Sequence, residues 1–202
     1  LDLPGTYSLN ASSMDESVVI ELLLNRNSKD FPDVAVVVTD VENLKRNLLL
    51  FTQVKDLGIP TLLVINMADQ MKRKGITLDV PLLEKALDTK IALLSTREKK
   101  GLEELKKMII DYRQLSTAAT ISINSIDEAY FQSLEKTFPN QSLYKLWLVI
   151  TQDVNFAKLD RKRVSDATDF KTASPSNLKR LQQKETVKRY QYINQVLKQG
   201  LN

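Results

Sequence analysis

The run Thr-Leu-Leu-Val-Ile at residues 61–65 constrains the fold of this chain more than any other stretch. It is short, apolar and rich in branched residues, and Gly58 and Pro60 precede it. This composition is typical of a strand buried on both faces, as inside a parallel sheet. A β-branched run at residues 34–39 predicts a second strand, and the helical segment between the two predicts a right-handed crossover. We therefore expect an α/β domain with a doubly wound parallel sheet.

Asn66 and Asp69 follow the predicted central strand, where open α/β sheets place their ligands. A carboxylate at this position can accept hydrogen bonds from a ring N–H and an exocyclic amine, a pair of donors that guanine presents and adenine does not. A site built for this pairing rejects a base that leaves the carboxylate unpaired. The alternative is that Asn66 caps a turn and Asp69 caps a helix.

A second loop of interest is the Asp-x-x-Gly pattern of Asp2 and Gly5, which follows one apolar residue. A carboxylate at a strand end can hold a metal-bound water, and a glycine lets a backbone N–H approach a terminal phosphate. The pattern therefore suits a magnesium and phosphate site. It is also short and common, and an ordinary Pro-Gly turn explains it equally simply.

Ser95, Thr96 and Arg97 form a third loop, directly after a predicted strand at residues 91–94. A backbone N–H in this loop could bond the carbonyl oxygen of guanine, although a simple strand-to-helix loop would look the same. Because the carboxyl ends of parallel strands open on one edge of a sheet, the three loops are expected to converge. That convergence favours a nucleotide site over three unrelated turns.

The composition excludes several classes of site. The 202 residues contain no Cys and no His, which excludes disulfides, thiolate or imidazole metal ligands and histidine-based catalysis. A bound metal would therefore be a hard ion with oxygen ligands, such as magnesium. The net charge of +4 does not by itself indicate nucleic acid. No apolar run approaches the length of about 18 residues that predicts a membrane span.

The remaining segments predict mostly loops and helices. The polar and basic residues 70–75 predict a loop over the base pocket, and Asp40 is expected to cap the helix that follows it. Small, polar residues at 116–125 predict a linker. Residues 126–202 show helical periodicity without strands, including a shorter helix at 156–170 and a long one from Pro175, and so predict a small helical bundle.

The order of these motifs resembles the GTPase domain of FeoB-type ferrous iron transporters over about residues 1–115. The segment Asp-Leu-Pro-Gly-Thr-Tyr-Ser-Leu at residues 2–9 looks like that family's Asp-x-x-Gly segment. Met67 stands where most small GTPases have Lys and is similar to the FeoB pattern. The segment Asn-Leu-Lys-Arg-Asn-Leu at 43–48 also resembles the family, and Ser-Thr-Arg followed by Gly-Leu-Glu-Glu-Leu at 101–105 is a looser match.

The resemblance implies a guanine-nucleotide site with GTP or GDP and Mg²⁺ as ligands. Asn66 and Asp69 would read the base, Met67 would belong to the same nucleotide-binding segment, and Ser95, Thr96 and Arg97 would line the base. Asp2 would hold magnesium through water, and Gly5 would sense the terminal phosphate.

The resemblance also implies a domain order and a cellular setting. Residues 1–115 would be the later part of a GTPase domain, 116–125 a linker, and 126–202 a helical domain that favours the GDP-bound state. The whole would be a cytoplasmic domain of a bacterial inner-membrane protein, with the membrane-embedded part of the same polypeptide as its partner and a homo-oligomer as a further option. Iron itself would be handled elsewhere, since borderline metals prefer His and Cys.

One departure from the family pattern is large. The phosphate-binding motif Gly-x-x-x-x-Gly-Lys does not occur in the sequence, nor does the first switch segment. We expect these parts, with the opening strands of the sheet, to lie upstream of Leu1 in a parent protein. Because that loop supplies most donors to the phosphates, this chain is expected to bind GTP weakly and to hydrolyse none. Thr6 also stands where Ras-like proteins have the catalytic Gln.

Two other readings remain open. The first is a GTPase of the ribosome-assembly type with an RNA-binding tail, which predicts a basic, aromatic surface in the second half. The tail has mixed charges and no Gly-x-x-Gly loop, so we do not expect a nucleic-acid partner. The second is a non-catalytic interaction module that keeps only the fold.

Overall fold

The computed structural model describes residues 1–10, 14–152, 164, 166, 171 and 173–201. Contacts divide the chain into two compact units. The first contains Leu1–Phe31 and Ile121–Arg189, and the second contains Pro32–Thr120 and Tyr190–Asn202. The predicted domains are each one continuous stretch of sequence, with boundaries near residues 115 and 126. Each observed unit instead combines two separate stretches, and the last helix contributes residues to both units.

The second unit contains a parallel sheet with the order β1-β2-β3. The strands are β1 (Ala35–Asp40), β2 (Thr61–Asn66) and β3 (Ile91–Leu93). The central strand β2 is buried on both faces from Thr61 to Ile65, as its composition predicts. All three strands run in one direction, so their carboxyl ends lie along one edge of the sheet.

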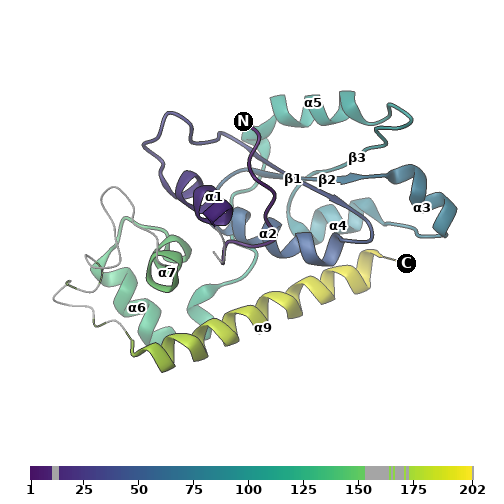
Figure 1. Cartoon of the computed structure of the whole chain (residues 1–202). Coiled ribbons are helices and arrows are strands. Elements are labelled where there is room, and N and C mark those ends of the chain that lie inside the picture. Colours follow the sequence, from purple (N-terminus) through teal and green to yellow (C-terminus); the bar gives the residue numbers. More distant parts are fainter. Residues whose placement is uncertain (11–13, 153–163, 165, 167–170, 172, 202) are drawn as a thin grey trace. The chain divides into compact units, whose positions relative to one another are not determined.

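Helices cover both faces of this sheet (Figure 1). On one face lie α2 (Leu44–Asp56) and α4 (Val80–Leu87), and on the other lies α5 (Leu102–Ile110), followed by the short helix η1 (Tyr112–Gln114). The first face is buried in a core cluster formed by Val37, Leu44, Leu48, Phe51, Leu63, Ile65, Leu83, Leu87, Ile91, Ile193 and Val196. The second face is buried in a smaller cluster formed by Leu62, Val64, Ala92 and Leu105. The predicted α/β architecture is confirmed.

The prediction of a loop at residues 70–75 is wrong, because most of this segment is the helix α3 (Ala68–Lys74). The helix ends at Gly75, whose left-handed backbone (φ 67°) forms the C-cap. Asp69 lies in its first turn and Lys72, Arg73 and Lys74 in its last, an order of charges that the helix dipole favours. The polar composition therefore marks a helix with an exposed last turn rather than a loop.

The predicted linker is partly held on the end of α2. The buried Lys55 ammonium donates a hydrogen bond to the Ser116 carbonyl oxygen at 2.7 Å. One residue along, the Asp56 carboxylate accepts hydrogen bonds from the backbone N–H and hydroxyl of Thr120 at 2.6 and 2.7 Å. Burial lowers the pKa of Lys55, and the nearby Asp88 and Asp56 oppose that effect.

The last turns of α9 (Pro175–Gly200) pack in the second unit. The backbone N–H of Asp79 donates to the Gly200 carbonyl oxygen at 2.9 Å, and Leu78 forms an antiparallel bridge with Leu201. The Tyr192 hydroxyl donates to the Ala86 carbonyl oxygen at 2.7 Å. The end of α9 is therefore tied to α4 and to the segment that precedes it.

Burial at this contact, assisted by Asp56 and Asp88, raises the pKa of Tyr192 to about 12. In the unfolded chain the tyrosine would ionise near its ordinary value of 10.0. A group with a raised pKa stabilises the fold below its unfolded pKa and loses that contribution as pH rises through its folded pKa. We expect the free energy of unfolding to fall more steeply between about pH 10 and 12 for the unaltered chain than for Tyr192→Phe. Urea unfolding at several pH values measures this difference, and parallel curves would contradict it.

The residues described between 126 and 201 form helices and the loops that join them, as predicted, and those up to Arg189 belong to the first unit together with Leu1–Phe31. This unit contains α1 (Met14–Leu24), η2 (Ile123–Ile126), α6 (Glu128–Thr137), α7 (Leu143–Thr151) and the beginning of α9. Phe131 and Trp147 pack edge to face with ring centroids 5.5 Å apart. The helix predicted at residues 156–170 falls almost entirely outside the described residues. Within the described chain, no helix combines the length and apolar character needed to cross a bilayer.

Candidate functional site

The loop after β2 has a constrained backbone. Met67 adopts the left-handed conformation (φ 59°, ψ 34°) and begins α3 as its N-cap. The Asn66 side-chain oxygen accepts the backbone N–H of Met67 at 2.8 Å, which holds this conformation. A non-glycine residue in this region is uncommon and costs about 1 kcal/mol or more, and such strain is often found at functional loops. Asn66 thus braces the loop, as its residue type predicts, and Met67 remains 44% exposed.

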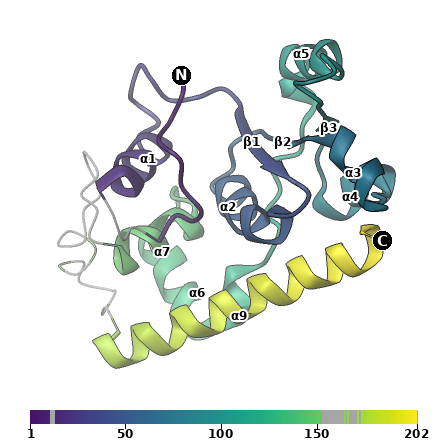
Figure 2. The same cartoon turned by 45° about the vertical axis from the view of Figure 1, so that its right-hand side comes forward.

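The loops after β2 and β3 are joined by backbone and side-chain hydrogen bonds. The backbone N–H of Ala68 donates to the Leu94 carbonyl oxygen at 2.9 Å, and that of Leu94 donates to Ile65 at 2.8 Å. The Ser95 hydroxyl donates to Oδ1 of Asp69 at 2.9 Å. Two residues that lie 26 positions apart in the sequence therefore meet at the carboxyl edge of the sheet. Figure 2 shows α3 continuing from that end of β2, beside β3.

The loop that carries Ser95 is closed on itself. Ser95 and Lys100 exchange backbone hydrogen bonds of 3.2 and 3.1 Å, and the Glu98 N–H donates to the Ser95 hydroxyl oxygen at 3.2 Å. Ser95 is only 3% exposed, whereas Thr96 and Arg97 are exposed at the tip of the loop. Gly101, with φ 86°, follows the closure. Ser95 is thus fixed against Asp69, and the other two predicted residues project from the rim.

The arrangement presents a carboxylate at a partly closed rim. The Asp69 side chain is only 8% exposed. Each carboxylate oxygen can accept two hydrogen bonds, so the bond from Ser95 leaves acceptor positions for further donors. A neutral heterocycle with two adjacent N–H donors is the kind of ligand that such a carboxylate pairs with. The alternative that Asp69 caps a helix does not fit, because Met67 is the N-cap of α3.

The tip of β1 is closed by its own side chains. The Asp40 carboxylate accepts the backbone N–H groups of Glu42 and Asn43, each at 2.9 Å, and the Asn43 amide. Burial raises the pKa of Asp40, but these hydrogen bonds and the positive charge of Lys74 outweigh it, so the net pKa is lowered. The helix begins at Leu44 with Asn43 as its N-cap, so the prediction that Asp40 caps it is wrong. Asp40 instead forms the turn that precedes the helix.

Asp2 and Gly5 belong to the first unit, whereas the two joined loops belong to the second. That the loop of Asp2 and Gly5 converges with the other two loops on one edge of the sheet stays a prediction, as does the magnesium role of Asp2. Both residues are exposed, and a side chain at Gly5 would meet nothing within 4 Å. Among the described residues, no group of three or more acidic side chains is placed to hold a metal ion.

One residue of the site is missing from the sequence predictions. The Arg73 guanidinium donates to Oδ2 of Asp69 at 3.2 Å. The signal was the spacing of four residues between an acid and a base, which pairs them only on a helix. Because the composition of residues 70–75 predicts a loop, in which residues four apart do not face each other, the sequence does not predict this pair.

The sequence matches the family described as "Ferrous iron transport protein B" over residues 1–109. The Fe(2+) transporter FeoB of Leptospira biflexa is 37% identical over 108 residues, which cover 54% of this chain and 15% of that protein. The Fe(2+) transporter FeoB of Campylobacter jejuni is 39% identical over 110 residues, covering 54% of this chain and 17% of that protein. The chain thus spans only a small part of the curated relatives it matches.

Solved structures support the same fold. The cytosolic domain of the T. maritima FeoB iron transporter in apo form superimposes with a TM-score of 0.82 at 22% identity, covering all of this chain and 79% of that one. The GMPPNP form of that domain gives a TM-score of 0.78 at 23% identity, covering 100% of this chain and 80% of that one. At this level of identity the likeness establishes the fold alone.

Proposed function

Because the chain belongs to the family of ferrous iron transport protein B, we propose that it carries the base-reading part of a guanine-nucleotide site that gates Fe²⁺ uptake in the whole transporter. The observation that carries this proposal is the contact between Asp69 and Ser95 at the carboxyl edge of the sheet. Asp69 would accept the ring N–H and the exocyclic amine of guanine. Ser95, Thr96 and Arg97 would line the base, with Asn66 and Met67 bracing the other side.

The residues present fit a guanine base better than they fit a triphosphate. The sequence has no Gly-x-x-x-x-Gly-Lys loop, so it lacks the backbone donors and the lysine that normally hold the phosphates. We propose that this chain alone binds GTP weakly and does not hydrolyse it. In the parent protein Gly5 would sense the terminal phosphate, and magnesium, held through Asp2 and water, would neutralise phosphate charge.

The setting of the chain is likewise proposed from its family. The FeoB protein of Leptospira biflexa is an Fe(2+) transporter, and the T. maritima structure is of a cytosolic domain. We propose that this chain lies on the cytoplasmic side of a bacterial inner membrane and acts on the membrane-embedded part of the same polypeptide. The segment of residues 6–13 and the helical unit would transmit the nucleotide state.

A titration with nucleoside monophosphates tests base reading directly. We expect GMP to shift the amide resonances of residues 66–69 and 95–97 in a ¹⁵N-labelled chain. AMP, which has the same charge but lacks the two adjacent donors, should bind at least about tenfold more weakly, since one hydrogen bond to a charged acceptor is worth about that factor. Equal binding of GMP and AMP would contradict the proposal.

A further inference from the structure

Arg73 holds the second oxygen of the carboxylate that the proposed site depends on. Its guanidinium donates to Oδ2 of Asp69 at 3.2 Å, while the Ser95 hydroxyl donates to Oδ1 at 2.9 Å. One donor comes from the helix that carries Asp69 and the other from the loop after β3. The carboxylate is therefore held at both oxygens by two different elements.

This pair of contacts fixes the plane of the carboxylate. With a single hydrogen bond, the carboxylate could still change its orientation by rotation about the Cα–Cβ and Cβ–Cγ bonds. Two donors, one on each oxygen, limit both rotations. Each oxygen still has acceptor capacity for one more hydrogen bond, so two adjacent donors of a ligand can approach together. The arrangement orients Asp69 before any ligand arrives, which lowers the entropy cost of binding.

We propose that Arg73 is a positioning residue that sets the selectivity of this edge for purines with an exocyclic amine beside a ring N–H. The inference rests on the proposed function, since it assigns a role within the same base-reading site. Arg73 itself is 61% exposed on its side chain and need not touch the base. Its effect passes through Asp69, so Arg73 should change the selectivity between bases more than the affinity that all nucleotides share.

The test compares GMP with IMP, which carry the same phosphate and differ only in the exocyclic amine. We expect the unaltered chain to prefer GMP by about tenfold, the worth of one hydrogen bond to a charged acceptor. In Arg73→Gln this ratio should fall to about threefold, because an exposed ion pair contributes at most about a fivefold factor. Arg73→Lys, which keeps a charged donor four residues from Asp69, should restore most of the ratio.

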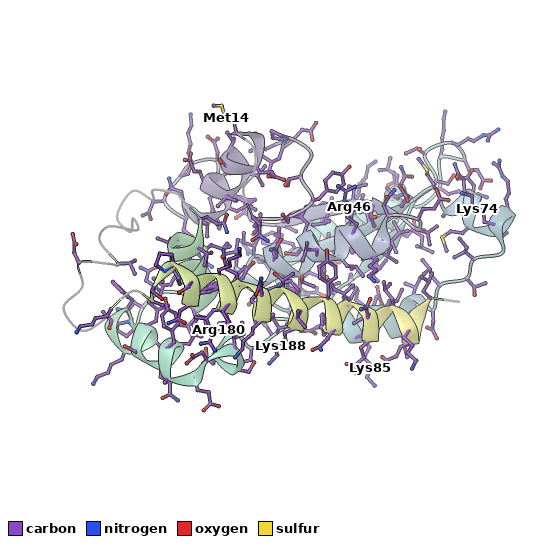
Figure 3. The ribbon with its side chains drawn as sticks, turned by 60° about the horizontal axis from the view of Figure 1, so that its bottom comes forward. Met14, Arg46, Lys74, Lys85, Arg180 and Lys188 are labelled. Carbon is purple, nitrogen blue, oxygen red and sulfur yellow. The ribbon has the colours of Figure 1, made fainter. Side chains whose placement is uncertain are left out.

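Lys74→Gln is the matched control, since it removes one positive charge from the same helical turn. Lys74 lies at the end of α3 (Figure 3) and pairs with Glu42, in the turn that follows β1, so it has its own partner apart from Asp69. This variant should leave the GMP-to-IMP ratio unchanged. If Arg73→Gln weakens GMP and IMP equally, Arg73 only attracts the phosphate and the inference is overturned while base reading stands. If the unaltered chain binds GMP and IMP alike, or binds neither, the proposed function fails and the inference fails with it.

Discussion

Asp69→Asn is expected to change the base that this chain prefers from guanine to xanthine. The exchange replaces one acceptor oxygen with an NH₂ donor, which would face the exocyclic amine of guanine, also a donor. Xanthine carries a carbonyl oxygen at that place and would accept the new hydrogen bond. We expect GMP affinity to fall by about ten- to a hundredfold and XMP affinity to rise by a comparable factor, as for hydrogen bonds that involve a charged group.

The same amide titration measures both ligands on both proteins. Asp111→Asn provides the control, because it also removes one carboxylate from the unit, at a half-buried position after the end of α5. It should leave the preference for GMP intact. An Asp69→Asn variant that still prefers GMP over XMP would show that this carboxylate does not read the base.

Gly101→Ala is expected to produce the largest loss of stability among single substitutions at the site. Gly101 has φ 86°, and a Cβ at this position would lie 2.0 Å from the Leu93 carbonyl oxygen. Leu93 is the last residue of β3, so relief of this overlap requires movement of the strand or of the loop that holds Ser95. We expect the free energy of unfolding to fall by about 3 kcal/mol or more, the range of strongly disruptive substitutions.

Gly75→Ala separates the steric effect from that of backbone conformation. Gly75 also has a positive φ, 67°, but nothing lies within 4 Å of the position of its missing Cβ. Its substitution should cost only about 1–2 kcal/mol, the penalty of a left-handed backbone for an ordinary residue. Urea unfolding with linear extrapolation measures both variants. Similar losses for the two variants would contradict the packing described around Gly101.

The strands of the second unit could be predicted because their signal is local. The run at residues 61–65 is buried on both faces, and a continuous apolar run is what such a strand requires. The two loops that follow β2 and β3 were predicted to converge because parallel strands share one carboxyl edge, and the bond between Ser95 and Asp69 confirms their meeting. The third loop, with Asp2 and Gly5, lies in the other unit and stays a prediction.

The features that escaped prediction depend on packing or on a competing turn. The last turn of α3 is exposed and basic, and Met71 is the one buried residue of the helix, so no apolar stripe distinguishes it from a loop, and the pair of Asp69 and Arg73 was missed with it. Asp40 has the residue type of an N-cap, but its carboxylate accepts the backbone N–H groups of Glu42 and Asn43 and so closes the turn that precedes α2. The docking of Gly200 beside Asp79 joins residues 121 positions apart, a contact that no local pattern encodes.

The position of a guanine base at the sheet edge is most directly measured in a crystal structure of this chain grown with GMP. We predict that both carboxylate oxygens of Asp69 lie at hydrogen-bond distance, about 2.7–3.1 Å, from the ring nitrogen and the exocyclic amine of the base. Ser95 should keep its bond to the same carboxylate. A GMP molecule bound away from Asp69, or one that turns its sugar or phosphate toward it, would contradict the base-reading role of this edge.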